Sequence, residues 1–269
     1  MASNDLSDKI SLKDWNTKYS ALVELIDSGS AESAQLLLKI AKEDEDFQFR
    51  GIAIKGFLKI HPAGILDDLA ELAKSSVVAN DEFPDMLRSW IILAIGSING
   101  KKSIVVLKKL EKELKPVEAS REMHFESSLE FSFLMAFSRL GQNDSAKKLV
   151  ELLPKIEQRE LVNALNEIGY CNNQIVAAGL AKFFDDKRIG SRIAPIRDYA
   201  EPPKTQEEKQ KREEIEKAAH VSICDDALFA ITQILKGIDW SFNPNPKRHY
   251  SDKEFALARK KIEAFGKKQ

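Results

Sequence analysis

Two adjacent carboxylates, Asp225 and Asp226, lie in the otherwise apolar stretch HVSICDDALFAITQIL, which also contains a histidine and a thiol. Neighbouring carboxylates push each other's pKa values apart, so such a pair has the chemistry of a general acid and a general base. On a helix, however, adjacent side chains point about 100° apart. Negative charge near a helix start also complements the helix dipole. We therefore predict a structural role for both residues, no catalytic residue and a chain that is not an enzyme.

The sequence lacks the familiar motifs of phosphate, dinucleotide, esterase and zinc sites: it contains no GxxxxGK[ST], GxGxxG, GxSxG, HExxH or Cx2C. Its four histidines lie at unrelated positions of the pattern described below, so they predict no metal site. Cys171 and Cys224 are far apart and lack metal-type spacing. Both are expected to be reduced thiols in a helical core. We predict neither a metal nor a cofactor.

The overall charge of the chain does not indicate what kind of partner it binds, because 41 basic residues nearly balance 42 acidic ones. Residues 1–100 are acidic, with 10 Lys and Arg against 16 Asp and Glu, and the rest is mildly basic. No stretch approaches the roughly 18 apolar residues of a membrane span, and the polar N-terminus does not resemble a signal peptide. A cytoplasmic protein without a membrane partner is therefore expected.

Five segments share the apolar spacing 0, 3, 4, 7, 8 and 11, in whole or in part, counted from Phe49, Leu87, Leu129, Leu161 and Ile223. This spacing places the residues on one face of a helix. The position at +7 is small in four of the five segments. A small residue there would let a neighbouring helix approach closely, while large residues at +4 and +8 fill the space beside it.

A second amphipathic segment precedes each of these five, so helical hairpins repeat about every 40 residues, which is the period of HEAT and armadillo arrays. No strand is predicted. The segments DFQFRGIAIKGFL (46–58) and DMLRSWIILAIG (85–96) resemble the second helix of a HEAT repeat, in which Asp and Arg precede a face of Ala, Leu and Gly. The stretch from Val221 to Trp240 resembles the closing repeat of bacterial HEAT-repeat proteins. The resemblance covers about residues 30–240 and is specific for architecture.

The fold class that follows is all-α: an α-solenoid of about five HEAT-like helical hairpins with N- and C-terminal capping helices. We expect a single domain over residues 1–269, with an N-terminal cap at 1–29, repeats at 30–236 and a C-terminal cap at 237–269. Trp15, Tyr19, Leu22 and Ile26 suit the first cap, and Trp240, Phe242 and Tyr250 are expected to anchor the last.

An insertion at residues 187–219 interrupts the last hairpin. Its prolines predict an extended course first. Thr205 and Glu208 then form a capping box that opens a charged helix to about Ala219. Because that helix has almost no apolar face, it is interpreted as a solvated spacer, with a binding element as the alternative.

The HEAT-like alkylpurine DNA glycosylases also resemble this pattern, and they cradle DNA in a concave groove. This resemblance implies a groove lined by basic residues. The candidates on the repeat helices are Arg50, Lys55, Lys59, Arg88 and Arg139, and those of the tail are Lys247, Arg248, Arg259, Lys260, Lys261, Lys267 and Lys268. Nucleic-acid binding is the alternative hypothesis for function.

Acidic residues in the turns that lead into the second helix of each hairpin favour a protein partner instead. They are Glu43, Asp44, Glu45, Asp46, Asp81, Glu82, Asp85, Glu122 and Glu126. Stacked repeats would align them into an acidic ridge that suits a basic protein surface, although turns are polar in most proteins. We interpret the chain as a non-catalytic interaction scaffold. The family resemblance implies an adaptor, or an immunity protein that neutralises a basic toxin such as a nuclease.

Overall fold

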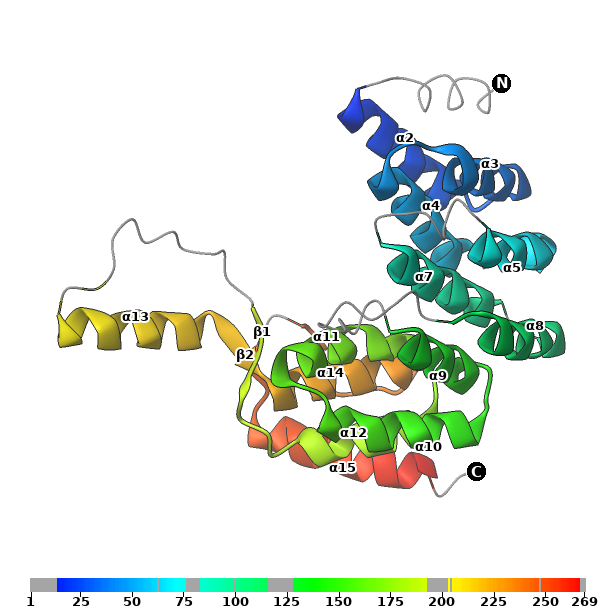
Figure 1. Ribbon diagram of the computed structural model, residues 1–269. Coiled ribbons are helices and arrows are strands. Elements are labelled where there is room, and N and C mark those ends of the chain that lie inside the picture. The colour runs from blue at the N-terminus through cyan, green and yellow to red at the C-terminus, as the bar shows by residue number, and fades with distance from the viewer. Residues whose placement is uncertain are drawn as a thin grey trace. The chain divides into compact units, whose positions relative to one another are not determined.

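The computed structural model describes residues 14–61, 63–75, 83–98, 100–115, 128–192, 203, 205–246 and 248–266, and the chain is mostly helical (Figure 1). It divides into two compact units, residues 1–145 and 146–269, called unit 1 and unit 2 below. The single domain expected over residues 1–269 stays a prediction. Among the described residues, no helix combines the length and the apolar character that crossing a bilayer requires.

Unit 1 consists of helices that form two rows. The first row contains α2 (Trp15–Ser28), α4 (Phe47–Ile60), α7 (Pro84–Ser97) and α9 (Leu129–Arg139), and each of these packs against the next. The second row contains α3 (Ala31–Glu43), η1 (Ala63–Ile65) with α5 (Leu66–Lys74), and α8 (Lys101–Glu113). Along this row α3 packs against α5, and α5 packs against α8. Each helix therefore has neighbours both within its row and across it.

Unit 2 is arranged around α14 (Ile223–Ile234), which packs against α11 (Gln158–Glu167), η4 (Ile168–Cys171), α12 (Gln174–Leu180) and η5 (Ala181–Phe183). The C-terminal helix α15 (Asp252–Gly266) packs against α12. The remaining elements are α10 (Asn143–Leu152), which begins at the end of unit 1, η3 (Leu153–Lys155), α13 (Gln206–Ala218) and the strands β1 (Ile189–Arg192) and β2 (His220–Ser222).

The five predicted apolar faces are confirmed as buried helix faces. They lie on α4, α7, α9, α11 with η4, and α14, and nearly all of their residues are buried. Side-chain caps set several of the helix starts: Asp14, Ser30 and Asp46 each accept a hydrogen bond from a backbone N–H in the first turn of α2, α3 and α4. Periodicity and capping together explain why these segments are helical.

The two strands differ from the sequence prediction, which contained none. β1 and β2 pair antiparallel at the two ends of the insertion, with Ile189 opposite Ser222 and Arg192 opposite His220. This pairing joins residues about 30 positions apart, and neither short segment alternates strongly in hydropathy, so local pattern does not reveal it. Within the insertion, the predicted capping box is confirmed: Thr205 N–H donates to Glu208 Oε2 at 3.2 Å, and Glu208 N–H donates to Thr205 Oγ1 at 3.1 Å.

The expected close approach at the small +7 position is visible at Gly56 on α4. A Cβ atom there would lie 2.7 Å from Ile26 Cγ1 of α2 and 3.4 Å from Leu37 Cδ1 of α3. Gly56 is thus the point where three helices of unit 1 meet, and any side chain must push one of them away.

We expect Gly56→Ala to lower the free energy of unfolding by about 1–3 kcal/mol, because overpacking a dense core forces side chains off their preferred rotamers. Urea unfolding followed by circular dichroism measures this. The matched control is Gly64→Ala, because a Cβ at Gly64 meets nothing within 4 Å. Equal stability of both variants would contradict the close-packing role of Gly56.

Candidate functional site

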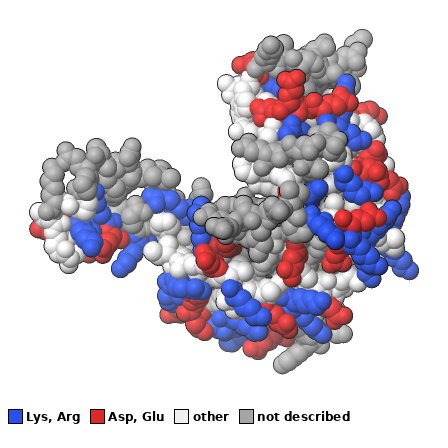
Figure 2. Space-filling model, in the orientation of Figure 1, with Lys and Arg blue, Asp and Glu red and all other residues white. Residues whose placement is uncertain are grey.

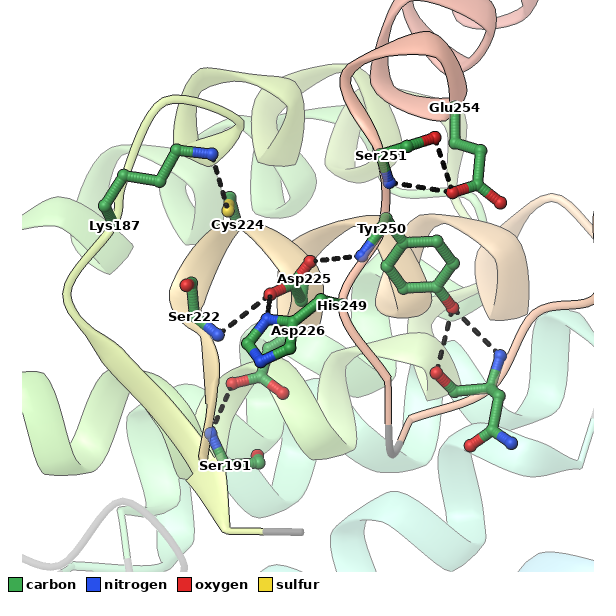
Figure 3. Close-up of polar contacts among 11 residues, drawn as sticks. Lys187, Ser191, Ser222, Cys224, Asp225, Asp226, His249, Tyr250, Ser251 and Glu254 are labelled. Atoms are coloured by element: carbon green, nitrogen blue, oxygen red, sulfur yellow. Dashed lines mark hydrogen bonds and ion pairs between the residues drawn. The ribbon is translucent and has the colours of Figure 1, made fainter. Parts of the chain in front are cut away.

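A buried polar cluster of unit 2 lies at the start of α14, where Asp225 and Asp226 are 3% and 4% exposed. Burying two carboxylates is costly unless each is hydrogen-bonded. Figure 3 shows that the two side chains diverge, Asp225 toward the segment that contains His249 and Tyr250 and Asp226 toward Ser191 of β1. The expected divergence of adjacent helical residues is confirmed, and each carboxylate serves a different segment of the chain.

Asp225 caps α14 and also holds the segment that leads into α15. Ser222 and Asp225 form a reciprocal capping box, in which Ser222 N–H donates to Asp225 Oδ2 at 2.9 Å. Tyr250 N–H donates to Asp225 Oδ1 at 2.8 Å, and His249 Nδ1 lies 3.0 Å from Oδ2. Both carboxylate oxygens are therefore occupied, one of them by two nitrogen groups.

Asp226 accepts a hydrogen bond from Ser191 N–H on β1, with an N to Oδ2 distance of 2.7 Å. The strand approaches this closely because Gly190 lacks a side chain: a Cβ there would lie 2.3 Å from Asp226 Oδ2. Burial raises the pKa of Asp226 to about 6, and the charge of Asp225 adds to that rise, while the bonds from Ser191 oppose it. Desolvation therefore outweighs hydrogen bonding at this carboxyl.

Cys224 lies in the same turn, and Lys187 Nζ is 3.7 Å from its Sγ (Figure 3). Burial raises the pKa of this thiol, so the neutral form is favoured. Both cysteines are buried and neither forms a disulfide, as expected. Among the described residues, no three His, Cys, Asp or Glu side chains are arranged to hold a metal ion. The cluster joins α14 to β1 through Asp226, and to His249 and Tyr250 through Asp225.

The acidic residues predicted to form a ridge have several different roles. Asp44 pairs with Lys18 of α2, with Nζ to Oδ2 at 2.6 Å, and Asp46 is the N-cap of α4. Glu43 and Glu45 are exposed and form no ion pair within the described part of unit 1. Asp85 pairs with the buried Arg88 at 3.1 Å. The other four, Asp81, Glu82, Glu122 and Glu126, lie outside the described residues, so a continuous ridge remains a prediction.

The turn between α3 and α4 has a well-bonded backbone. Arg50 Nη1 donates to the carbonyl oxygens of Asp44 and Glu45 at 2.6 and 3.1 Å, and Asp46 N–H donates to Asp44 Oδ1 at 3.0 Å. These bonds fix the positions from which the Glu43 and Glu45 side chains extend. Figure 2 shows acidic side chains gathered over the end of unit 1 that contains α2 and α3.

Exposed aromatic residues lie beside this turn, which the sequence interpretation did not anticipate. Trp15 and Tyr19, which were expected to suit an N-terminal capping helix, are 44% and 41% exposed. Their rings stack with centroids 5.1 Å apart, and Trp15 also contacts Phe49 at 5.6 Å. The helix α2 instead buries Ala21, Leu22 and Leu25. Helical spacing identified an apolar stripe here, but it could not show how much of it the neighbouring helices cover.

Several cations proposed for a nucleic-acid groove are engaged within unit 1. Arg50 bonds to the α3–α4 turn, the buried Arg88 bonds to Asp85 and to the Ala73 carbonyl, and Lys55 Nζ lies 3.9 Å above the Trp90 ring. Of the tail candidates, Arg259 contacts Asp185, and Arg248 pairs with Glu254 while stacking over Tyr250. These contacts do not favour a row of basic side chains open to phosphates.

Comparison with known proteins leaves the family open. No protein-family model matches the chain, and none of the curated proteins compared with it gives a significant match. The HEAT-like architecture is therefore a proposal that depends on the repeat pattern and on the helix packing described above.

We expect Asp225→Ala to lower the free energy of unfolding by about 2–5 kcal/mol, because it leaves the N–H groups of Ser222 and Tyr250 without an acceptor. Urea unfolding measures the change. The matched control is Asp67→Ala, since the Asp67 side chain is 74% exposed and pairs with an exposed Lys102. That control should change stability by no more than about 0.5 kcal/mol. Equal effects of the two variants would refute the role assigned to Asp225.

Proposed function

We propose that this chain is a HEAT-like helical-repeat scaffold that binds a basic protein partner and catalyses no reaction of its own. The packing of unit 1 supports the repeat architecture. Its helices form two rows in which α4, α7 and α9 follow one another, with α3, α5 and α8 beside them. Stacked hairpins of this kind present side chains from successive turns on one surface, which suits the recognition of another protein.

The observation that carries the proposal is the surface at the N-terminal end of unit 1, called the aromatic-acidic surface here and defined by Trp15, Tyr19, Glu43 and Glu45. It combines a stacked, half-exposed aromatic pair with two exposed carboxylates. Lys18 connects the two parts. It pairs with Asp44 in the acidic turn, and its Nζ lies 4.2 Å from the centre of the Phe49 ring. Trp15 contacts the same Phe49 ring.

This surface has the composition of a protein-binding site. Trp and Tyr are enriched among the residues that dominate binding energy, since they bury a large area and lose little side-chain entropy. The carboxylates beside them favour a partner with Lys or Arg, by steering its approach and by charge-assisted contacts. The bonds of Arg50 and Lys18 hold the surface in place before binding, which lowers the entropic cost of association.

Two roles fit such a scaffold. An adaptor would hold a basic segment of another protein, and an immunity protein would cover the basic active surface of a toxin such as a nuclease. Both require the same contact chemistry, in which apolar and cationic side chains of the partner meet the aromatic-acidic surface. The nucleic-acid alternative instead requires cations that are open to phosphates. Three of the cations proposed for it, Arg50, Lys55 and Arg88, contact other groups of unit 1.

We expect the double variant Glu43→Lys with Glu45→Lys to weaken partner binding about tenfold, through loss of steering and like-charge repulsion. Trp15→Ala should weaken it by a further factor of about 30, the typical effect of losing an aromatic hot spot. The measurement is quantitative mass spectrometry of proteins captured on the tagged chain from nuclease-treated lysate of the source cell, followed by affinity measurement with the purified partner.

The control carries the same charge change elsewhere, Glu111→Lys with Glu151→Lys, because both of these side chains are exposed. Partners captured equally by all variants would contradict the aromatic-acidic surface. If recovery depends instead on nucleic acid and disappears after nuclease treatment, the nucleic-acid alternative replaces the proposal.

Trp15 also provides a direct test of occupancy, because Trp90 and Trp240 are only 8% and 5% exposed. Acrylamide quenching of tryptophan fluorescence should therefore report mainly on Trp15. We expect the purified partner to reduce this quenching, and the effect to disappear in Trp15→Phe. Unchanged quenching at saturating partner would place the binding site elsewhere.

A further inference from the structure

The insertion of unit 2 contributes an arm, defined here by its described residues 188–192 and 205–222, which joins the helical body through the β1–β2 pair. Figure 1 shows α13 running away from the other helices of unit 2, and none of its described side chains is buried. A helix of 13 residues without tertiary burial is marginally stable by itself. The contacts at the base of the arm therefore determine where α13 is held.

The base of the arm is held by several hydrogen bonds between uncharged groups and by two carboxylates, Asp225 at Ser222 and Asp226 at β1. Ile223 N–H donates to the Arg188 carbonyl at 2.9 Å, Cys224 N–H donates to the Asp186 carbonyl at 3.0 Å, and Gln158 Nε2 donates to the Ile189 carbonyl at 2.8 Å. The carboxylate contact with β1 is that of Asp226 with Ser191 N–H, which places the buried carboxyl directly against the backbone of Gly190.

We propose that Asp226 is a proton-sensitive latch, which holds β1 and the base of the arm against α14 more tightly when its carboxyl is protonated. The geometry favours this role for three reasons: the carboxyl is buried, it lies between two segments distant in sequence, and Gly190 allows the strand to seal it from water. Opening the ribbon would expose the carboxyl, so its protonation state must influence the opening equilibrium.

The direction of the effect follows from the two environments of the carboxyl. Burial raises the pKa of Asp226 from 3.8 to about 6 when the arm is closed, whereas the carboxyl would recover its ordinary value when the arm opens. The closed state therefore binds the proton more tightly, so closure is most favourable at acidic pH and becomes less favourable as the pH rises through 6. Between pH 5 and pH 7.5 these values correspond to an approximately tenfold change in the closing equilibrium.

Several of the other ionisable groups near the latch have their own partners. On α14, Asp225 is the charge that acts on Asp226, and it is bonded to Ser222, Tyr250 and His249. Ahead of β1, Arg188 pairs with Asp186, and Lys187 lies at Cys224. Arg192 and His220 oppose each other at the other end of the ribbon. On α11, Ser191 Oγ bonds to the neutral Asn166, and the helix also carries Arg159, Glu160 and Glu167.

Hydrogen exchange of the full-length protein tests the latch. Exchange is followed by mass spectrometry at pH 5.0 and pH 7.5, and protection is corrected for the intrinsic pH dependence of exchange. We expect amides of β1 and β2 to be about tenfold better protected at pH 5.0. Peptides from α12, which contributes no residue to the latch, should show the same protection at both values and serve as the internal reference.

Two variants assign the effect to Asp226. Asp226→Asn keeps an acceptor for Ser191 N–H and cannot ionise, so the arm should be well protected at both pH values. His249→Gln removes the imidazole that contacts Asp225 and should leave the pH dependence of the ribbon intact. Gly190→Ala places a Cβ against Asp226 and should release the ribbon at both pH values.

Three results would overturn the proposal: ribbon protection in the wild-type protein that is constant or lower at pH 5.0, a pH dependence that survives in Asp226→Asn, or one that disappears in His249→Gln. If Asp226→Asn fails to fold, the carboxyl ¹³C resonance of Asp226 in the wild-type protein decides. A midpoint near 6 supports the latch, and an ordinary midpoint near 4 refutes it. These measurements concern unit 2 alone, so the latch and the proposed function can fail independently.

Discussion

The helices of unit 1 depend on their neighbours to bury their apolar faces, and α7 shows this dependence most clearly. Every residue from Leu87 to Ser97 is buried between α4, α5, α8 and α9. Even the charged Arg88 is buried. The cost of burying its guanidinium is offset by hydrogen bonds to Asp85 and to the Ala73 carbonyl. A helix buried in this way is not stable by itself, so the helices of unit 1 must pack together to form a core.

The same dependence explains why the aromatic-acidic surface remains exposed at the N-terminal end of unit 1. The helix α2 uses Ala21, Leu22 and Leu25 to cover α3 and α4. Trp15 and Tyr19 lie on the part of α2 that these neighbours cover only in part, and they stack on each other. An aromatic pair left half exposed beside fixed carboxylates combines anchor residues with a polar rim, as protein interfaces do.

Unit 2 uses its two buried carboxylates in different ways. Asp225 receives three nitrogen groups from two segments, so its burial is compensated and its removal would leave unpaired donors. Asp226 accepts one backbone N–H, and this bond does not offset the loss of solvent around the charged carboxylate. The pKa of this carboxyl therefore rises. A buried carboxyl kept in its charged form at neutral pH opposes folding. Such a departure from optimal stability is expected where a residue has a role besides packing.

Much of the helical framework was predictable because helix faces and helix starts are local. The spacing from Phe49, Leu87 and Leu129 identified three buried faces, and the small residue at Gly56 indicated a close helix approach. The capping box of Thr205 and Glu208 predicted the start of α13. The acidic turn at residues 43–46 was identified by composition alone, but composition could not separate the capping and paired carboxylates from the two that extend into solvent.

The sequence by itself determined which segments are helices, which faces they bury and that Asp225 and Asp226 diverge from one another, because all three depend on the geometry of a single helical turn. Only the tertiary structure decided that Asp226 lies against Gly190, that β1 pairs with β2, and that Trp15 and Tyr19 remain exposed. The pairing of β1 with β2 and the contact of Asp226 with Gly190 join segments about 30 residues apart in the chain. The exposure of Trp15 and Tyr19 depends on how much of α2 the neighbouring helices cover. Periodicity within one segment contains neither kind of information.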